Sequence, residues 1–287
     1  MPAGPGHDGI VERTVCGGSN EPGKPALHEH DKENAAPRVN IPNFIPSIHS
    51  ASVVPVDSST VRDWDDLDAE DHEDPLMVAE YVVEIFNYMK SLEPQITPQA
   101  DYMDTQKELN WHSRSVLIDW LIEVQWKLKL LPETLFLSVN IIDRFLSKRS
   151  VSLVKLQLVG MAATLLASKY EEVLSPSIAN FVYLADNAYD EQELLKAERY
   201  MLHVLNFSLA FPSPLVFLRR ISKAEDYDVR SRTLAKYLME VCMLDQRFVA
   251  CPPSMMAATA IYIAREMLKS GPWVSLFFTS VNQVIEV

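Results

Sequence analysis

The chain has 287 residues, of which 48% are hydrophobic and 23% charged, the balance of a soluble globular protein. Its net charge of −13 argues against a surface built to bind nucleic acid or an anionic membrane. Three cysteines without C-x-x-C spacing argue against a disulfide scaffold or zinc site. Because the N-terminus lacks the apolar region of a secretion signal and no apolar run is long enough for a bilayer, we expect a soluble intracellular protein.

The first part of the chain is poor in clustered apolar residues. Residues 1–62 are rich in Pro, Gly, Ser and His, which predicts a disordered tail. A dense acidic run, residues 63–74, follows and is interpreted as a solvated linker. Apolar residues at helical spacing then predict a helix over residues 75–93, so residues 63–110 are interpreted as an acidic linker and an N-terminal helix.

Five helices are predicted within residues 111–210. Amphipathic spacing marks the first over 116–128, and Pro132 begins a second that ends near Leu146. The third, over 153–170, is apolar nearly all round and rich in Gly and Ala, which is typical of a helix at the centre of a bundle. The fourth begins near Ser175, and Asp190 caps a fifth that runs to about Leu205.

A second set of helices is predicted after the break at residues 211–214. These cover 215–222, 229–244 and 253–268, and small residues again mark the centre of the last one, which suggests a duplicated unit. Residues 274–287 are too few for two more helices. We therefore predict an all-α protein in which residues 211–287 form an incomplete second repeat.

The sequence offers no catalytic constellation. G-x-S-x-G, P-loop and Rossmann glycine patterns are absent, and the histidines are scattered, so we expect no catalytic residue, no metal and no cofactor. Arg114 and Asp143 lie on two predicted helices. They are interpreted as an interhelical ion pair, although unpaired surface charges are also consistent with the sequence.

Four ordered segments resemble the signature of the cyclin box. They are SRSVLIDWLIEV (113–124), NIIDRFL (140–146), KLQLVG (155–160) and LASKYEE (166–172). Residues 64–93 and FLRRISKA (217–224) resemble B-type, mitotic cyclins of fungi, and the likeness covers residues 63–273. It implies a cyclin fold: an N-terminal helix, a five-helix cyclin box and a truncated second repeat.

The resemblance implies a regulatory subunit that is not an enzyme. It would bind and activate a mitotic cyclin-dependent serine/threonine kinase as a heterodimer at the G2/M transition, in nucleus and cytoplasm. By similarity, Lys169 and Glu198 would hydrogen-bond the kinase near its regulatory helix. The neighbouring contacts would come from Tyr81, Ile85, Tyr170, Glu171, Phe207 and Leu209.

A second surface implied by the resemblance is a shallow groove for Arg-x-Leu-like substrate segments. Its positions correspond to Val116, Leu117, Trp120, Glu123 and Gln157. Apolar walls would hold the Leu and Glu123 would pair with the Arg, whereas Leu117 and Trp120 are also consistent with an ordinary core. Ser113 stands where the family usually has Met, and Ser115 where it has Ala, so weaker docking is expected.

In the tail, Lys32, Glu33 and Asn34 form a Lys-Glu-Asn box of the kind that a ubiquitin ligase recognises, a three-residue pattern that also recurs by chance. Two other functions are consistent with parts of this pattern. Transcription factor IIB and its relatives share the paired five-helix fold but need basic faces, which this acidic chain lacks. A scaffold with the cyclin fold that activates no kinase is also consistent with the sequence.

Overall fold

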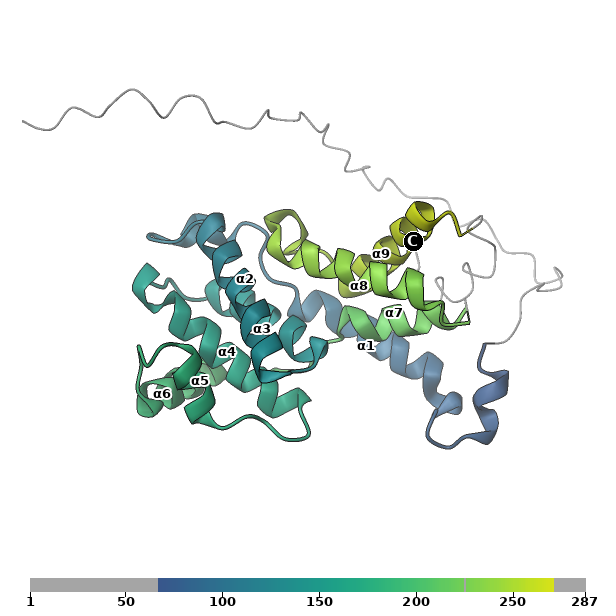
Figure 1. The fold of residues 1–287 in the computed structure, drawn as a ribbon, viewed down its shortest axis with the longest axis horizontal. Coiled ribbons are helices and arrows are strands. Elements are labelled where there is room, and N and C mark those ends of the chain that lie inside the picture. The colour runs from purple at the N-terminus through teal and green to yellow at the C-terminus, as the bar shows by residue number, and fades with distance from the viewer. Residues whose placement is uncertain (1–66, 225, 271–287) are drawn as a thin grey trace, which may run out of the picture. The chain divides into compact units, whose positions relative to one another are not determined.

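The computed structural model describes residues 67–224 and 226–270, and every regular element in these two ranges is helical (Figure 1). This agrees with the predicted all-α class. The expectations of a tail at residues 1–62, a degradation signal at 32–34 and a shortened end after residue 273 lie outside the described residues.

The N-terminal helix begins later than the sequence predicts. Two 3-10 helices, η1 (Ala69–Glu73) and η2 (Ala79–Tyr81), precede α1 (Val82–Ile96), so the prediction of one helix over 75–93 is wrong at its start. Val78 adopts a left-handed backbone conformation with φ of 51°, which interrupts helical geometry between the acidic run and α1.

The first repeat contains five α-helices and two short 3-10 helices. They are η3 (Tyr102–Thr105), α2 (Trp111–Leu128), α3 (Pro132–Leu146), η4 (Leu153–Lys155), α4 (Leu156–Glu171), α5 (Ile178–Leu184) and α6 (Glu191–Val204). As expected from its small residues, α4 is central and packs against α2, α3, α5 and α6. At Gly160 a Cβ atom would lie 2.8 Å from Cδ1 of Leu117, so glycine allows α2 and α4 to approach closely.

Local capping explains where several of these helices begin. Asp190 accepts a hydrogen bond of 2.6 Å from the Glu193 backbone N–H at the start of α6, as predicted. The carboxylate that caps α3 comes from another element: Glu172 accepts hydrogen bonds from the Leu131 N–H (2.7 Å) and the Thr134 hydroxyl (2.6 Å). A negative charge at this position also suits the positive end of the α3 dipole.

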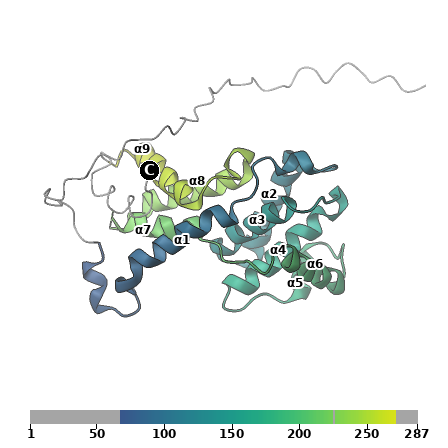
Figure 2. The same ribbon diagram turned by 180° about the vertical axis from the view of Figure 1, so that it is seen from behind.

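The second repeat contains α7 (Pro214–Lys223), α8 (Val229–Leu244), η5 (Gln246–Phe248) and α9 (Pro253–Leu268). These bounds confirm the predicted helices to within one residue. The small-residue helix α9 packs against both α7 and α8, as α4 does against its own neighbours. The two repeats are joined where α8 contacts α2, and α1 lies alongside α7 in both views (Figures 1 and 2).

Candidate partner-binding surface

An ion pair between α4 and α6 lies at the centre of the expected partner-binding surface. The Lys169 ammonium donates to Oε1 of Glu198 at 2.5 Å. Glu198 is almost fully buried, with its side chain 8% exposed, whereas the Lys169 side chain is 43% exposed. The buried carboxylate therefore holds a lysine whose side chain is partly exposed and whose ammonium has three N–H donors in all.

Exposed aromatic side chains also lie at the ends of α4 and α6, the two helices that carry this pair. Tyr170 follows Lys169 at the end of α4 and is 53% exposed, and Phe207 is 62% exposed beyond the end of α6. Phe207 adopts a left-handed backbone with φ of 56°, and its N–H donates to the Leu202 carbonyl at 2.9 Å. This tight turn leaves a large apolar ring in solvent, while Leu209 packs against the core.

The loop after α4 adds residues that sequence reasoning missed. Val173 is 98% exposed and Leu174 is 88% exposed, directly after the predicted residues Tyr170 and Glu171. The sequence did contain a clue to this exposure. Val173 and Leu174 are consecutive apolar residues in a connection between two helices, where they cannot belong to the buried face of either helix. Such exposed apolar side chains beside a charged pair are typical of an interaction surface.

Glu171 lies in an acidic environment on the same surface. Burial raises the pKa of the Glu171 carboxyl above its ordinary value, and the neighbouring charges of Glu133 and Glu172 raise it further. The Glu172 carboxylate accepts the two hydrogen bonds that cap α3. These bonds hold its negative charge beside Glu171. The ionised form of Glu171 is therefore electrostatically disfavoured in the free chain.

The two residues expected at the surface from α1 are exposed. Tyr81, at the end of η2, is 53% exposed, and Ile85, in the first turn of α1, is 41% exposed. Tyr88, one turn further on, is 60% exposed and extends the same apolar stripe, which the sequence reasoning did not include. These residues come from an element that precedes the first repeat.

Arg114 and Asp143 form a buried ion pair between α2 and α3. Nε and Nη2 of Arg114 donate to the two carboxylate oxygens of Asp143, each at 2.7 Å. Nη1 donates to the Met243 carbonyl of α8 at 2.9 Å, and the Tyr102 hydroxyl donates to Asp143 at 2.8 Å. With side chains 2% and 4% exposed, the pair joins the two repeats rather than forming part of a surface.

The residues expected to form a substrate-docking groove separate into surface and core. Val116 is 55% exposed, Glu123 lies in solvent 3.7 Å from Lys127, and Trp120 and Gln157 are half-buried. The prediction that Leu117 lines the groove needs correction. Leu117 is only 6% exposed and packs against Gly160. Its side chain therefore belongs to the core and offers a partner little surface.

The two serines that depart from the family pattern both have structural roles. Ser113 forms a capping box with Asn110 at the start of α2, through backbone-to-side-chain hydrogen bonds of 2.8 and 3.1 Å. The Ser115 hydroxyl donates to the Leu244 carbonyl of α8 at 2.8 Å. Ser113 therefore stabilises the start of α2, and Ser115 links the two repeats.

Two further properties concern residues 67–224 and 226–270 alone. In these ranges no group of three or more His, Cys, Asp or Glu side chains is arranged to hold a metal ion. None of the helices described there combines the length and apolar character required to cross a bilayer.

Comparison with known proteins agrees with this architecture. Residues 84–210 match the cyclin N-terminal domain, and residues 212–281 match the cyclin C-terminal domain. The chain belongs to the cyclin family. The second match extends past residue 273, where the sequence analysis expected the likeness to stop.

Its relatives include mitotic cyclins of fungi. The chain is 61% identical over 229 residues to the G2/mitotic-specific cyclin cdc13 of Schizosaccharomyces pombe, covering 80% of this chain and 47% of that protein. It is 57% identical over 208 residues to the G2/mitotic-specific cyclin-B of Emericella nidulans, covering 72% and 44%. The chain therefore spans about half the length of the curated relatives it matches.

Among solved structures, a viral cyclin from herpesvirus saimiri has the same fold. It superposes with a TM-score of 0.61 at 22% identity, over 70% of this chain and 93% of the viral one. The relatives confirm the resemblance to B-type mitotic cyclins of fungi, and the family matches and the viral structure confirm the predicted cyclin fold.

Proposed function

We propose that the chain is the regulatory subunit of a mitotic cyclin-dependent serine/threonine kinase, which it binds and activates without an active site of its own. The observation that supports this most is the Lys169–Glu198 pair, whose lysine side chain is partly exposed and is followed along the chain by exposed aromatic and apolar side chains. The high identity to G2/mitotic-specific cyclins supports the same assignment.

The activation mechanism follows from a rigid surface that binds one state of its partner more tightly. Kinase activity requires a Lys–Glu ion pair that forms when a mobile helix takes its active position. A cyclin surface that binds this helix only in the active position shifts the kinase population toward it. On this proposal Glu171, whose ionised form is disfavoured in the free chain, would gain a basic partner in the complex.

The substrate and degradation surfaces belong to the same proposal. Val116, Trp120 and Glu123 would bind an Arg-x-Leu-like segment, with Glu123 exchanging its contact with Lys127 for the substrate arginine. The Lys-Glu-Asn box at residues 32–34 would be read by a ubiquitin ligase, and the complex would act in nucleus and cytoplasm.

The test compares two lysine–glutamate pairs that both join the α4 region to α6. Lys169→Ala with Glu198→Ala should reduce activation of a purified fungal mitotic cyclin-dependent kinase at least about tenfold, the effect expected of an interface hot spot. The control is Lys155→Ala with Glu193→Ala, because that pair is exposed and its atoms lie 3.8 Å apart. Equal activation by both double variants would refute the proposal.

A further inference from the structure

The segment before α1 is attached to two basic residues of the second repeat by ion pairs, one of which joins Lys223 and Asp68 at 3.8 Å. The Asp68 carboxylate accepts two hydrogen bonds from the Arg220 guanidinium of α7, and the Asp71 carboxylate pairs with the Lys223 ammonium. Arg220 and Asp68 are 7% and 14% exposed, and Lys223 and Asp71 are 14% and 17% exposed. We call Asp68–Arg220 and Asp71–Lys223 the anchor pairs.

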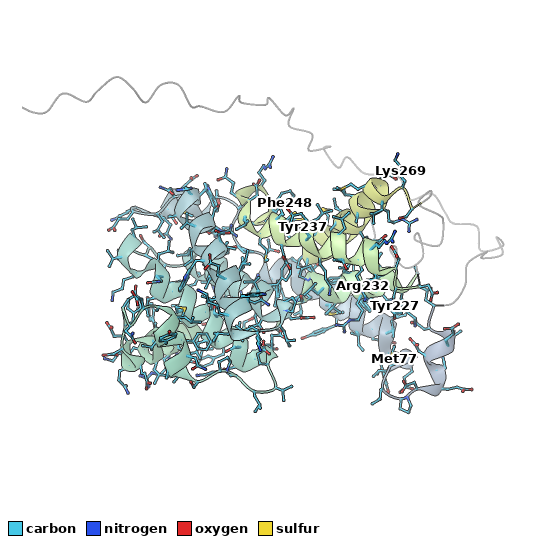
Figure 3. All side chains as sticks on the ribbon, viewed as in Figure 1. Met77, Tyr227, Arg232, Tyr237, Phe248 and Lys269 are labelled. Carbon is cyan, nitrogen blue, oxygen red and sulfur yellow. The ribbon has the colours of Figure 1, made fainter. Side chains whose placement is uncertain are left out.

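These contacts show that part of the acidic run is not a solvated linker. Burial alone would raise the pKa of Asp68, but the hydrogen bonds and charge of Arg220, together with the charge of Lys223, outweigh it and lower the pKa. Asp68 is therefore ionised and paired at neutral pH. The anchor pairs hold η1, and Met77, labelled in Figure 3, lies between η1 and η2.

Aromatic and cation–π contacts continue the attachment near the start of α1. The Phe86 ring lies 5.9 Å from the Phe217 ring of α7, and the Arg220 guanidinium lies 5.7 Å from the centre of the Phe86 ring. Phe217 is fully buried. Arg220 thus contacts both the acidic segment and α1, so one side chain couples the anchor pairs to the helix.

The C-terminal end of α1 is attached to α9. The Ser254 backbone N–H donates to Oε1 of Glu93 at 2.6 Å, and the Ser254 hydroxyl donates to Oε2 at 2.9 Å. Glu93 is 7% exposed and lies at the first turn of α9, where the helix dipole favours a negative charge. The helix is therefore attached to the second repeat near its start and near its end, and the segment before it is attached to α7.

The exposed residues of α1 lie on a different face from the attached ones. Phe86 and Glu93, two turns apart, both contact the second repeat. Tyr81, Ile85 and Tyr88, spaced four and three residues apart, form the exposed stripe. One face of the helix thus packs against the second repeat, and another face is exposed and can contact a partner.

We propose that the second repeat positions α1 for kinase binding through the anchor pairs and the Glu93–Ser254 contact, so that residues of α7 and α9 set kinase affinity through α1. This inference rests on the proposed function. A partner that binds α1 only in its anchored position would bind in proportion to the anchored fraction of the chain. Arg220 and Lys223 are positioning residues in this account.

The first experiment measures anchoring in the free chain. Asp68→Asn with Asp71→Asn removes two charges at nearly constant volume. Glu70→Gln with Glu73→Gln removes two charges from exposed side chains of the same segment and is the matched control. Hydrogen exchange of residues 67–96 should be at least about tenfold faster in the first variant and unchanged in the control, with α2 to α6 unaffected in both. Unchanged exchange at 67–96 in the first variant would overturn the anchoring.

The second experiment measures affinity for a purified fungal mitotic cyclin-dependent kinase. If the anchored fraction falls to about a tenth, Kd should rise about tenfold in the Asp68→Asn, Asp71→Asn variant, while kinase activity at saturating cyclin stays the same. Exchange that shows the anchored fraction reduced to about a tenth, together with an unchanged Kd, would overturn the positioning role. Failure of the unmodified chain to bind the kinase would instead refute the proposed function, and the exchange experiment would still decide whether α1 is anchored.

Discussion

Removal of Arg114 should be among the most damaging single changes in the chain. In Arg114→Met, Asp143 would keep its hydrogen bond from the Tyr102 hydroxyl but lose both bonds to the guanidinium. The Met243 carbonyl would also lose its donor, which weakens the connection between α2 and α8. The substitution therefore leaves a carboxylate that is 4% exposed without a counter-charge.

The burial of the pair sets the expected loss in the free energy of unfolding. Breaking a buried ion pair by removing one partner costs about 3–5 kcal/mol, because the remaining charge stays desolvated. Replacing both partners with apolar residues, Arg114→Met with Asp143→Leu, removes that charge and should recover at least about 1 kcal/mol of the loss. Lys127→Met is the control, because its pair with Glu123 is exposed and worth less than about 1 kcal/mol.

Urea unfolding of the full chain measures these differences, provided that the slope with denaturant is the same for all variants. Lys127→Met should be the most stable of the three variants, the double variant should be intermediate, and Arg114→Met should be the least stable. A loss below about 1 kcal/mol for Arg114→Met, or a double variant less stable than the single one, would refute the buried-pair account.

Three further predictions concern the interior. Glu172→Gln should lower the free energy of unfolding by about 1 kcal/mol, because the cap of α3 loses its charge; an unchanged Tm would count against this. Gly160→Ala should cost about 1–3 kcal/mol, because the new Cβ meets Leu117, and a stabilised variant in thermal melts would contradict the close approach. Burial raises the pKa of the Cys251 thiol to about 11 from an ordinary 9.0, so the stability it contributes is complete below pH 9.0 and is lost as pH rises through 11. Its alkylation in the native chain at pH 8 should be slow, and rapid labelling of the Cys251 peptide in mass spectra would contradict its burial.

The helices of the second repeat could be predicted almost to the residue because local signals agree there. Pro214 and Pro253 lie at the starts of their helices, Asp228 caps α8, and the apolar spacing matches the helical period. The start of α1 could not be predicted in this way. Val78 is an apolar residue at helical spacing, and nothing in the local sequence shows its left-handed conformation.

The anchor pairs could not be predicted from the sequence, because their partners are far apart along the chain. Asp68 and Asp71 stand in a run of acids that has the composition of a solvated linker, and each partner lies 152 residues away on α7. Their pairing depends on the tertiary fold, which brings η1 beside α7. Leu117 shows the opposite case, because resemblance alone placed it in a groove, whereas packing against Gly160 places it in the core.

The central claim is that exposed side chains on α1, at the end of α4 and in the turn after α6 together bind a kinase. Hydrogen exchange of the chain, measured with and without a purified fungal mitotic cyclin-dependent kinase, tests it most directly. The account predicts slower exchange in the complex at residues 81–88, 169–174 and 205–209, with the far end of α8 unchanged. A tight complex whose protection falls mainly on α8 and α9 would contradict it.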